Sequence, residues 1–203
     1  MKKENPIPTW ASSMVESLLA ALRARDPYTY GHCCRVSSQA RLLAEAAGLS
    51  VYDQTRIEYA SIFHDIGKIG IPDAILLKRS RLTTAEERVM QEHPERGVSI
   101  LKPLESIPFF ADIIPGILHH HERIDGRGYP YGLAGDSIPL EARVIIIADT
   151  FDAMTTTRPY RNKLDHEKAY QELKQFAGRQ FDAQLVRIFL RAHPTWELLT
   201  EAA

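Results

Sequence analysis

The fold class depends most on one short run, Val144-Ile145-Ile146-Ile147. β-branched side chains of this kind favour a strand on propensity alone. A strand needs a partner to satisfy its backbone hydrogen-bonding groups, and the sequence offers no second run like this one. We therefore predict that the run is a helix buried on all sides. With it we predict an all-α fold, a single domain that covers residues 1–203.

Much of the remaining chain has the spacing of amphipathic helices. Apolar residues recur at helical intervals in 14–22 and in 36–47, and Gly48 follows the second segment as glycine commonly follows a helix end. Ser50 and Asp53 resemble a capping box that opens a helix running to about Phe63. Residues 1–12 are predicted to be a loosely ordered extension, and the glycine-rich stretch 125–139 a long loop.

Other helix starts are marked by residues that commonly occupy a cap or a first turn. These are Thr83 or Thr84, a proline near 108, Asp165 and Asp182. Pro94 either ends the helix that begins at Thr83 or Thr84, or lies in the first turn of another.

The composition excludes several broad classes of protein. Hydrophobic residues make up 44% and charged residues 25% of the chain, which is not typical of disorder. A net charge of −1 argues against non-specific binding to a nucleic-acid polymer or an anionic membrane. No apolar run reaches the roughly 18–20 residues of a membrane helix. The adjacent Cys33 and Cys34 could pair only in a strained ring, so we expect reduced core thiols and a cytoplasmic location.

Histidines and acids gather near the ends of the predicted helices. They are His32, expected to open a helix, His64-Asp65, His93 and the triplet His119-His120-His121. Asp149 follows the apolar run, where an unpaired carboxylate would be strongly destabilising. Each residue could have a separate structural role. One metal centre is the simpler explanation, because imidazole and carboxylate together suit borderline or hard divalent metals.

In order and spacing, these residues resemble the HD-GYP domain, a class of phosphohydrolase that degrades cyclic di-GMP. The matching stretches are DPYTYGH at 26–32, HDIGKIGIPDAIL at 64–76, EHPERG at 92–97, HHERIDGRGYP at 120–130 and ADTFDAMTTTRPYR at 148–161. Together they cover roughly residues 15–190. The resemblance implies a helical bundle of the HD superfamily with a dinuclear metal centre in its core.

The resemblance also implies which residues hold the metals. One ion would be bound by His32, His64, Asp65 and Asp149, and the other by Asp65, His93, His120 and His121. Asp65 would therefore bridge two divalent ions, with iron or manganese the best match to this ligand mixture. His119 matches no ligand position and is expected to pack nearby. Some members place a glutamate for a third metal where this chain has Tyr28, so we expect two ions.

The reaction implied is hydrolysis of cyclic di-GMP to linear pGpG, with continuation to GMP left open. Two metals can share a bridging hydroxide that attacks phosphorus. Asp65 and Lys68 are the predicted catalytic residues, with Lys68 placed one helical turn after His64 to contact a phosphate oxygen. The predicted substrate-binding residues are Lys68, Asp125, Gly126, Tyr129, Arg158 and Arg161.

Two alternatives to this function stay open. A hydrolase of another cyclic dinucleotide, such as cyclic GMP-AMP, or of another nucleotide phosphoester would need the same metal core. A non-catalytic cyclic di-GMP sensor belongs to a different class. The GYP loop of the family is implicated in docking GGDEF domains, and the amino-terminal helix could form a homodimer. No nucleic-acid polymer or membrane partner is expected.

Overall fold

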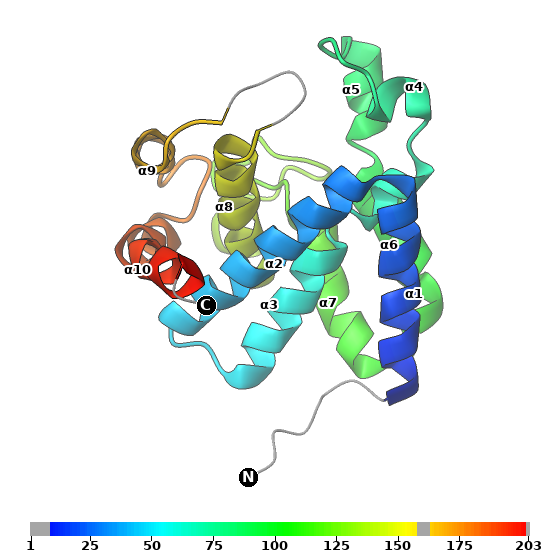
Figure 1. Ribbon diagram of the computed structural model, residues 1–203, viewed down its shortest axis with the longest axis horizontal. Coiled ribbons are helices and arrows are strands. Elements are labelled where there is room, and N and C mark those ends of the chain that lie inside the picture. Colours follow the sequence, from blue (N-terminus) through cyan, green and yellow to red (C-terminus); the bar gives the residue numbers. More distant parts are fainter. Residues whose placement is uncertain (1–8, 158–162, 202–203) are drawn as a thin grey trace.

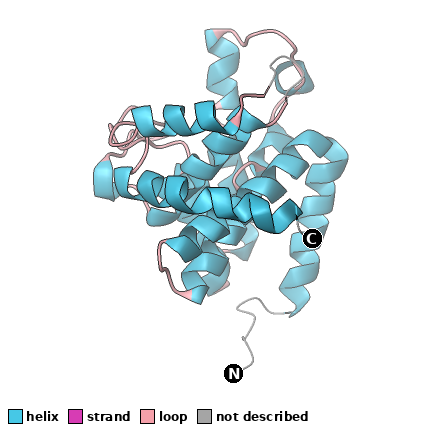
Figure 2. Cartoon of the chain, turned by 60° about the vertical axis from the view of Figure 1, so that its left-hand side comes forward, coloured by secondary structure: helices cyan, strands magenta, loops and turns pink. Residues whose placement is uncertain are grey.

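The computed structural model describes residues 9–157 and 163–201, and every regular element in these ranges is helical (Figures 1 and 2). The α-helices are α1 (Thr9–Arg25), α2 (Pro27–Ala46), α3 (Val51–Phe63), α4 (Asp73–Leu76), α5 (Thr84–Met90), α6 (His93–Leu101), α7 (Pro108–His119), α8 (Leu140–Thr155), α9 (His166–Gln175) and α10 (Ala183–Glu201). The 3-10 helices are η1 (Ile66–Gly70), η2 (Lys102–Leu104) and η3 (Gly135–Ser137). Within these ranges there are isolated bridges but no strand, so the predicted all-α fold is confirmed.

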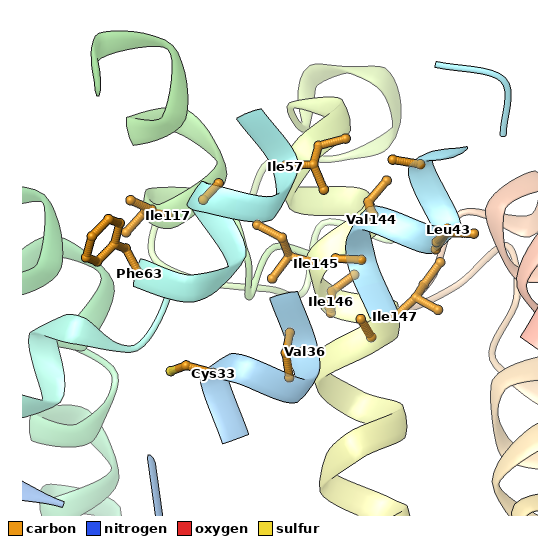
Figure 3. Close-up of a cluster of buried hydrophobic side chains, with 14 of the residues drawn as sticks. Cys33, Val36, Leu43, Ile57, Phe63, Ile117, Val144, Ile145, Ile146 and Ile147 are labelled. Carbon is orange, nitrogen blue, oxygen red and sulfur yellow. The ribbon is translucent and has the colours of Figure 1, made fainter. Parts of the chain in front are cut away.

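The run that decided the fold class lies in α8 at the centre of the molecule. Val144, Ile145 and Ile147 are fully buried, and α8 packs against α2, α3, α7 and α9. Figure 3 shows the side chains of residues 144–147 among others from α2, α3 and α7. Burying one such side chain contributes about 1.5–3 kcal/mol, more than the roughly 0.7 kcal/mol or less that its helix propensity loses. Burial therefore outweighs the strand preference, and the predicted buried helix is confirmed.

Polar caps set most of the helix starts where the sequence predicted them. The hydroxyl of Ser50 accepts a hydrogen bond from the Asp53 amide, and Thr83 forms a capping box with Glu86. The acids predicted to cap α9 and α10 each accept amide hydrogen bonds in the first turn. Of the two alternatives for Pro94, the second holds, because α5 ends at Met90 and Pro94 lies in the first turn of α6.

Two element boundaries differ from the predictions. α2 begins at Pro27 with Asp26 as its cap, so His32 lies in the second turn and does not open the helix. Proline suits a first helical position because it has no amide hydrogen to leave unpaired. α1 begins at Thr9, inside the stretch 1–12 predicted as an extension, and residues 1–8 lie outside the described ranges.

α4 and α5 project from the rest of the bundle at one end, at the top of Figure 1. Arg25, at the end of α1, connects the base of this projection to the bundle. Its guanidinium group donates a hydrogen bond of 3.0 Å to the carbonyl of Ile71 and forms an ion pair with Asp73. Among the described helices, none is both long and apolar enough to cross a bilayer.

Candidate metal centre and substrate cavity

Five segments bring the seven predicted metal ligands to one place in the core. The ligands are His32 on α2, His64 and Asp65 at the end of α3, His93 at the start of α6, His120 and His121 at the end of α7, and Asp149 on α8. His121 and Asp149 are partly exposed, whereas the other five side chains are buried. The rings of His120 and His121 are 4.1 Å apart, because the helix ends at His119 and its regular side-chain divergence stops there.

The ligands form two groups with Asp65 between them. The coordinating atoms of His93, His120 and His121 all lie within 4.8 Å of one another, and a second group contains His32, His64 and Asp149. One Asp65 oxygen is 3.2 Å from His93 Nε2 in the first group, and the other is 3.5 Å from His64 Nε2 in the second. Apart from Asp65, these groups contain the same residues as the two ligand sets implied by the resemblance, and Asp65 lies close to both groups.

Hydrogen bonds to the backbone fix the tautomers of three histidines. They run from His64 Nδ1 to Ser61 O (2.5 Å), from His93 Nδ1 to Met90 O (2.8 Å) and from His120 Nδ1 to Ile117 O (2.7 Å). A carbonyl can only accept, so Nδ1 carries the proton and Nε2 of the neutral ring keeps a lone pair. Nε2 of His93 and Nε2 of His120 are 3.1 Å apart, so two lone pairs face each other at close range. A cation bound between the two nitrogens would relieve this repulsion.

The charge states of the site also suit a metal. Burial, the largest effect, lowers the pKa of His93 to about 3 and that of His121 to about 4, so both rings are neutral near pH 7. Burial alone would raise the pKa of Asp65. Lys68 and the surrounding histidines outweigh it and hold that pKa well below the usual value. His93 and His121 are thus neutral imidazoles beside the charged carboxylate of Asp65, and these are the protonation states required of metal ligands.

Two buried ligand atoms have no hydrogen-bond partner among the described residues. They are Nε2 of His64 and Oδ1 of Asp65. A buried polar atom left unpaired is destabilising by about 1–3 kcal/mol, and a bound cation would remove that penalty. The residues present therefore fit divalent metal ions.

His32 is oriented by a carboxylate that the sequence analysis did not single out. Its Nδ1 lies 2.7 Å from Asp152, its Nε2 lies 3.1 Å from Asp149, and Arg35 donates two hydrogen bonds to Asp152. Burial lowers the pKa of His32, but the hydrogen bonds to Asp149 and Asp152 outweigh it and raise the pKa to about 9. A metal on Nε2 would replace that proton, while Asp152 keeps the proton on Nδ1. The signal was the spacing from Asp149, since residues three apart share a helix face.

Replacing Asp152 with alanine is expected to weaken metal binding by about 10–100-fold, because His32 would lose the group that fixes its ring. Titration with Mn²⁺ against a chelator of known affinity measures the change. Arg35→Ala is the matched control: it breaks the Arg35–Asp152 pair and leaves Asp152 on His32, so its loss should be smaller. Wild-type affinity in Asp152→Ala would show that the orientation of His32 does not depend on this carboxylate.

A cavity of about 750 Å³ opens onto the metal ligands. Its wall includes Lys68, whose ammonium group donates a 2.5 Å hydrogen bond to Asp65. Burial alone would lower the pKa of Lys68, but Asp65 outweighs it and raises that pKa, so the side chain is a cation. Lys68 reaches the wall from the 3-10 helix η1 and not from a continuation of α3, which ends at Phe63.

Tyr129 forms another part of the cavity wall. Its ring stacks on His121, with the ring centres 4.6 Å apart and the planes at 24°. Burial, reinforced by Asp65 and Asp149, raises the pKa of the phenol, which therefore stays neutral. Tyr28, which stands where some HD-GYP members carry a glutamate, lines the same cavity.

Two residues of the glycine-rich loop that were predicted to bind substrate lie outside the cavity wall, and two others of the same segment line it. Asp125 and Gly126 do not line the cavity; Asp125 accepts two hydrogen bonds from Arg123 and one from the amide of Arg127. Arg123 and Arg127, which the sequence analysis missed, do line it. The signal for them was two cations inside the loop that follows the histidine triplet. Contact of Asp125 and Gly126 with substrate stays a prediction, and the predicted Arg158 and Arg161 lie outside the described residues.

Glu122 fixes the conformation of the same loop through hydrogen bonds to its backbone. Its carboxylate is buried and accepts hydrogen bonds from the amides of Tyr131 (2.8 Å) and Leu133 (3.0 Å). His119 lies near Glu122, with its Nδ1 3.8 Å from the carboxylate, and its ring lies beside that of Tyr131. It belongs to neither ligand group.

The two cysteines differ in environment. Cys33 is fully buried, as expected of a core residue, whereas Cys34 is only half-buried. Cys33 lies within reach of His64 and Asp65. Burial, with Asp65 second, raises the pKa of its thiol, so it is a neutral thiol and a poor metal ligand.

Comparison with known sequences places the chain in a family. The model of the HD domain matches residues 16–185. The cyclic di-GMP phosphodiesterase response regulator RpfG of Xanthomonas campestris is 41% identical over 89% of this chain and 47% of its own length. A cyclic di-GMP phosphodiesterase of Thermotoga maritima is 41% identical over 82% and 45%, respectively. The 3′3′-cGAMP-specific phosphodiesterase 2 of Vibrio cholerae is 38% identical over 89% and 34%. The chain thus spans less than half of the length of each of these three relatives.

Solved structures share the fold. A cyclic GMP-AMP phosphodiesterase of V. cholerae, V-cGAP3, aligns with a TM-score of 0.67 at 20% identity, over 91% of this chain and 49% of that one. The HD domain of the Listeria monocytogenes phosphodiesterase PgpH, in complex with cyclic-di-AMP, aligns with a TM-score of 0.63 at 20% identity, over 85% and 91%. The match of the HD domain model to residues 16–185 shows that the chain belongs to the HD domain family, as its HD-GYP motifs predicted.

Proposed function

We propose that this chain is a metal-dependent phosphodiesterase that hydrolyses cyclic di-GMP to linear pGpG. The observation that carries the proposal is the pair of ligand groups on either side of Asp65, open to a cavity with Lys68 in its wall. Relatives at 41% identity are named cyclic di-GMP phosphodiesterases, which supports the same substrate class here.

The metals we propose are two divalent ions per chain, iron or manganese. Five histidines and two carboxylates form the donor set, and Cys33, which lies near His64 and Asp65, is a neutral thiol. Such nitrogen and oxygen donors suit these ions. When bound, two divalent ions supply an acidified water and positive charge for the phosphoryl oxygens.

The protein's own residues bind and orient the substrate in this proposal. Lys68 stays protonated beside Asp65 and donates to a phosphate oxygen, where it stabilises negative charge that grows during cleavage. Tyr129, stacked on His121, presents a flat and neutral face on which a purine can lie. Arg123 lines the cavity, and its hydrogen bond to Asp125 orients the side chain. Its positive charge is therefore already in the cavity wall before a substrate binds.

Cyclic GMP-AMP is the second candidate substrate. It is favoured by the 38% identity to the 3′3′-cGAMP-specific phosphodiesterase 2 of V. cholerae. Both substrates present the same phosphodiester to the same metal centre, so contacts to the bases decide between them.

A direct test combines metal analysis with product analysis. Protein purified without oxygen should contain about two metal ions per chain, and it should convert cyclic di-GMP to pGpG. Assays with cyclic GMP-AMP beside it rank the two substrates by kcat/KM. Metal-replete protein that binds the dinucleotides and leaves both intact would instead indicate the sensor.

Three further predictions concern the protein's binding partners, its oligomeric state and its location in the cell. Docking of GGDEF domains would use the loop around Tyr129, where Tyr131 is 59% exposed. A homodimer would use α1, on which Met14 is exposed. The adjacent free thiols of Cys33 and Cys34 suit the reducing cytoplasm.

A further inference from the structure

A second cavity lies between α4 and α5, beside the first. It has a volume of about 570 Å³, with an apolar floor that includes Ile75, Leu82 and Met90. Leu76, Leu82 and Met90 line both cavities, so the two share a wall. Because the first cavity opens onto the metal ligands, a molecule bound there could extend over this wall into the second.

The rim of the second cavity is cationic. Lys78, Arg79 and Arg81 all line it. Lys78 is neutralised by Glu86, 2.5 Å away, and this pair closes the α4–α5 connection at the capping box of α5. Arg79 and Arg81 are exposed, and neither guanidinium group forms an ion pair with another described residue. Two positive charges are therefore available to a ligand.

We propose that the cavity between α4 and α5 is a second nucleotide subsite, which binds the half of a cyclic dinucleotide that is not being cleaved. The inference rests on the proposed function. A cyclic dinucleotide carries two phosphates, and only one can lie at the metals and Lys68. Arg79 and Arg81 hold the other phosphate, since a guanidinium group matches its geometry with paired hydrogen bonds. The apolar floor contacts the face of the attached base.

The size and the charge of the second cavity indicate that it binds a nucleotide and is not simply a solvated part of the surface. Each cavity falls within the roughly 300–1,000 Å³ of small-molecule sites, so the two together suit a ligand of two joined nucleotides. Exposed cations that only contact solvent do not require an apolar surface beside them. A nucleotide would use both, because its base contacts the apolar floor and its phosphate contacts the positive charges. Arg25 connects the start of α4 to the bundle, which holds the projection beside the metal centre.

The test compares the double variant Arg79→Ala/Arg81→Ala with Arg88→Ala. Arg88 is an exposed cation on α5 that lines neither cavity, so it controls for the loss of charge on the projection. The double variant should raise the KM for cyclic di-GMP by at least about tenfold, because charge-assisted hydrogen bonds are lost, with a smaller effect on kcat. Charge reversal in Arg79→Glu/Arg81→Glu should raise KM further.

A small substrate separates the subsite from the metal centre. Bis(p-nitrophenyl) phosphate has one phosphodiester and no second nucleotide, so its kcat/KM should fall at least about tenfold less than that of cyclic di-GMP in the double variant. An equal fall for both substrates, or an unchanged KM for cyclic di-GMP in an active enzyme, would overturn the subsite and leave the proposed function standing. Metal-replete wild type that neither binds nor hydrolyses either cyclic dinucleotide would overturn both.

Discussion

Replacing Asp65 with alanine is expected to remove both metal ions and to lower phosphodiester hydrolysis by at least about a thousandfold. The carboxylate lies 3.2 Å from His93 in one ligand group and 3.5 Å from His64 in the other, so its loss affects both metal positions. It also accepts the hydrogen bond of Lys68, and without it the ammonium group loses the contact that orients it. Elemental analysis of the purified variant, together with initial rates on cyclic di-GMP, measures both effects.

His119→Ala is the matched control, because it removes an imidazole one residue before the two predicted ligands. His119 belongs to neither ligand group and contacts Glu122 and Tyr131 instead. The variant should keep about two metals per chain and most of the activity. A variant at His119 that lost its metals, or an Asp65→Ala protein that kept both, would show that the ligand assignment within these motifs is wrong.

The fold could be predicted because a few residues left little choice. The run 144–147 had no partner strand anywhere in the sequence, and the structure buries it in α8. The polar caps Ser50 and Thr83 act within three residues, so local sequence was sufficient to place them. Pro94 could not be resolved in advance, since proline is compatible with a helix end and with a first turn.

The candidate site was predictable only where its residues fall in motifs. The resemblance supplied His93 and Asp149, which are far apart in sequence and belong to the two different ligand groups of the same centre. Periodicity alone could not have paired them. Asp152 was missed because its role depends on the distance to His32 on another helix. Its spacing from Asp149 places it on the same face of α8 but does not give that distance. Arg79 and Arg81 were missed because an exposed cation in a loop usually indicates only a solvated surface.

The close approach of η1 to α6 leads to the second large effect. A Cβ atom added at Gly67 would lie 1.9 Å from the carbonyl oxygen of His93 and 2.5 Å from the amide nitrogen of Gly97. Both are backbone atoms, so no side-chain rotation can relieve the overlap, and η1 and α6 must move apart. Asp65 precedes η1 and His93 begins α6, so the movement displaces one predicted ligand from the other. We expect Gly67→Ala to lower the free energy of unfolding by at least about 3 kcal/mol. Hydrolysis should fall at least about a hundredfold, because a ligand shifted by about 1 Å no longer fits the reacting geometry.

Gly70→Ala tests whether the Gly67 effect comes from this contact or from the general loss of a glycine in η1. Its added Cβ would meet only the side chain of Arg96, 3.1 Å from Nη1, and that partly exposed side chain can rotate away. The variant should stay within about 1 kcal/mol of wild-type stability and keep its metals. Urea unfolding and metal analysis of both variants give the comparison. Equal losses would mean that flexibility of η1 matters more than its contact with His93. A larger loss at Gly67 would show that His93, a predicted metal ligand, is positioned by backbone packing that only glycine permits.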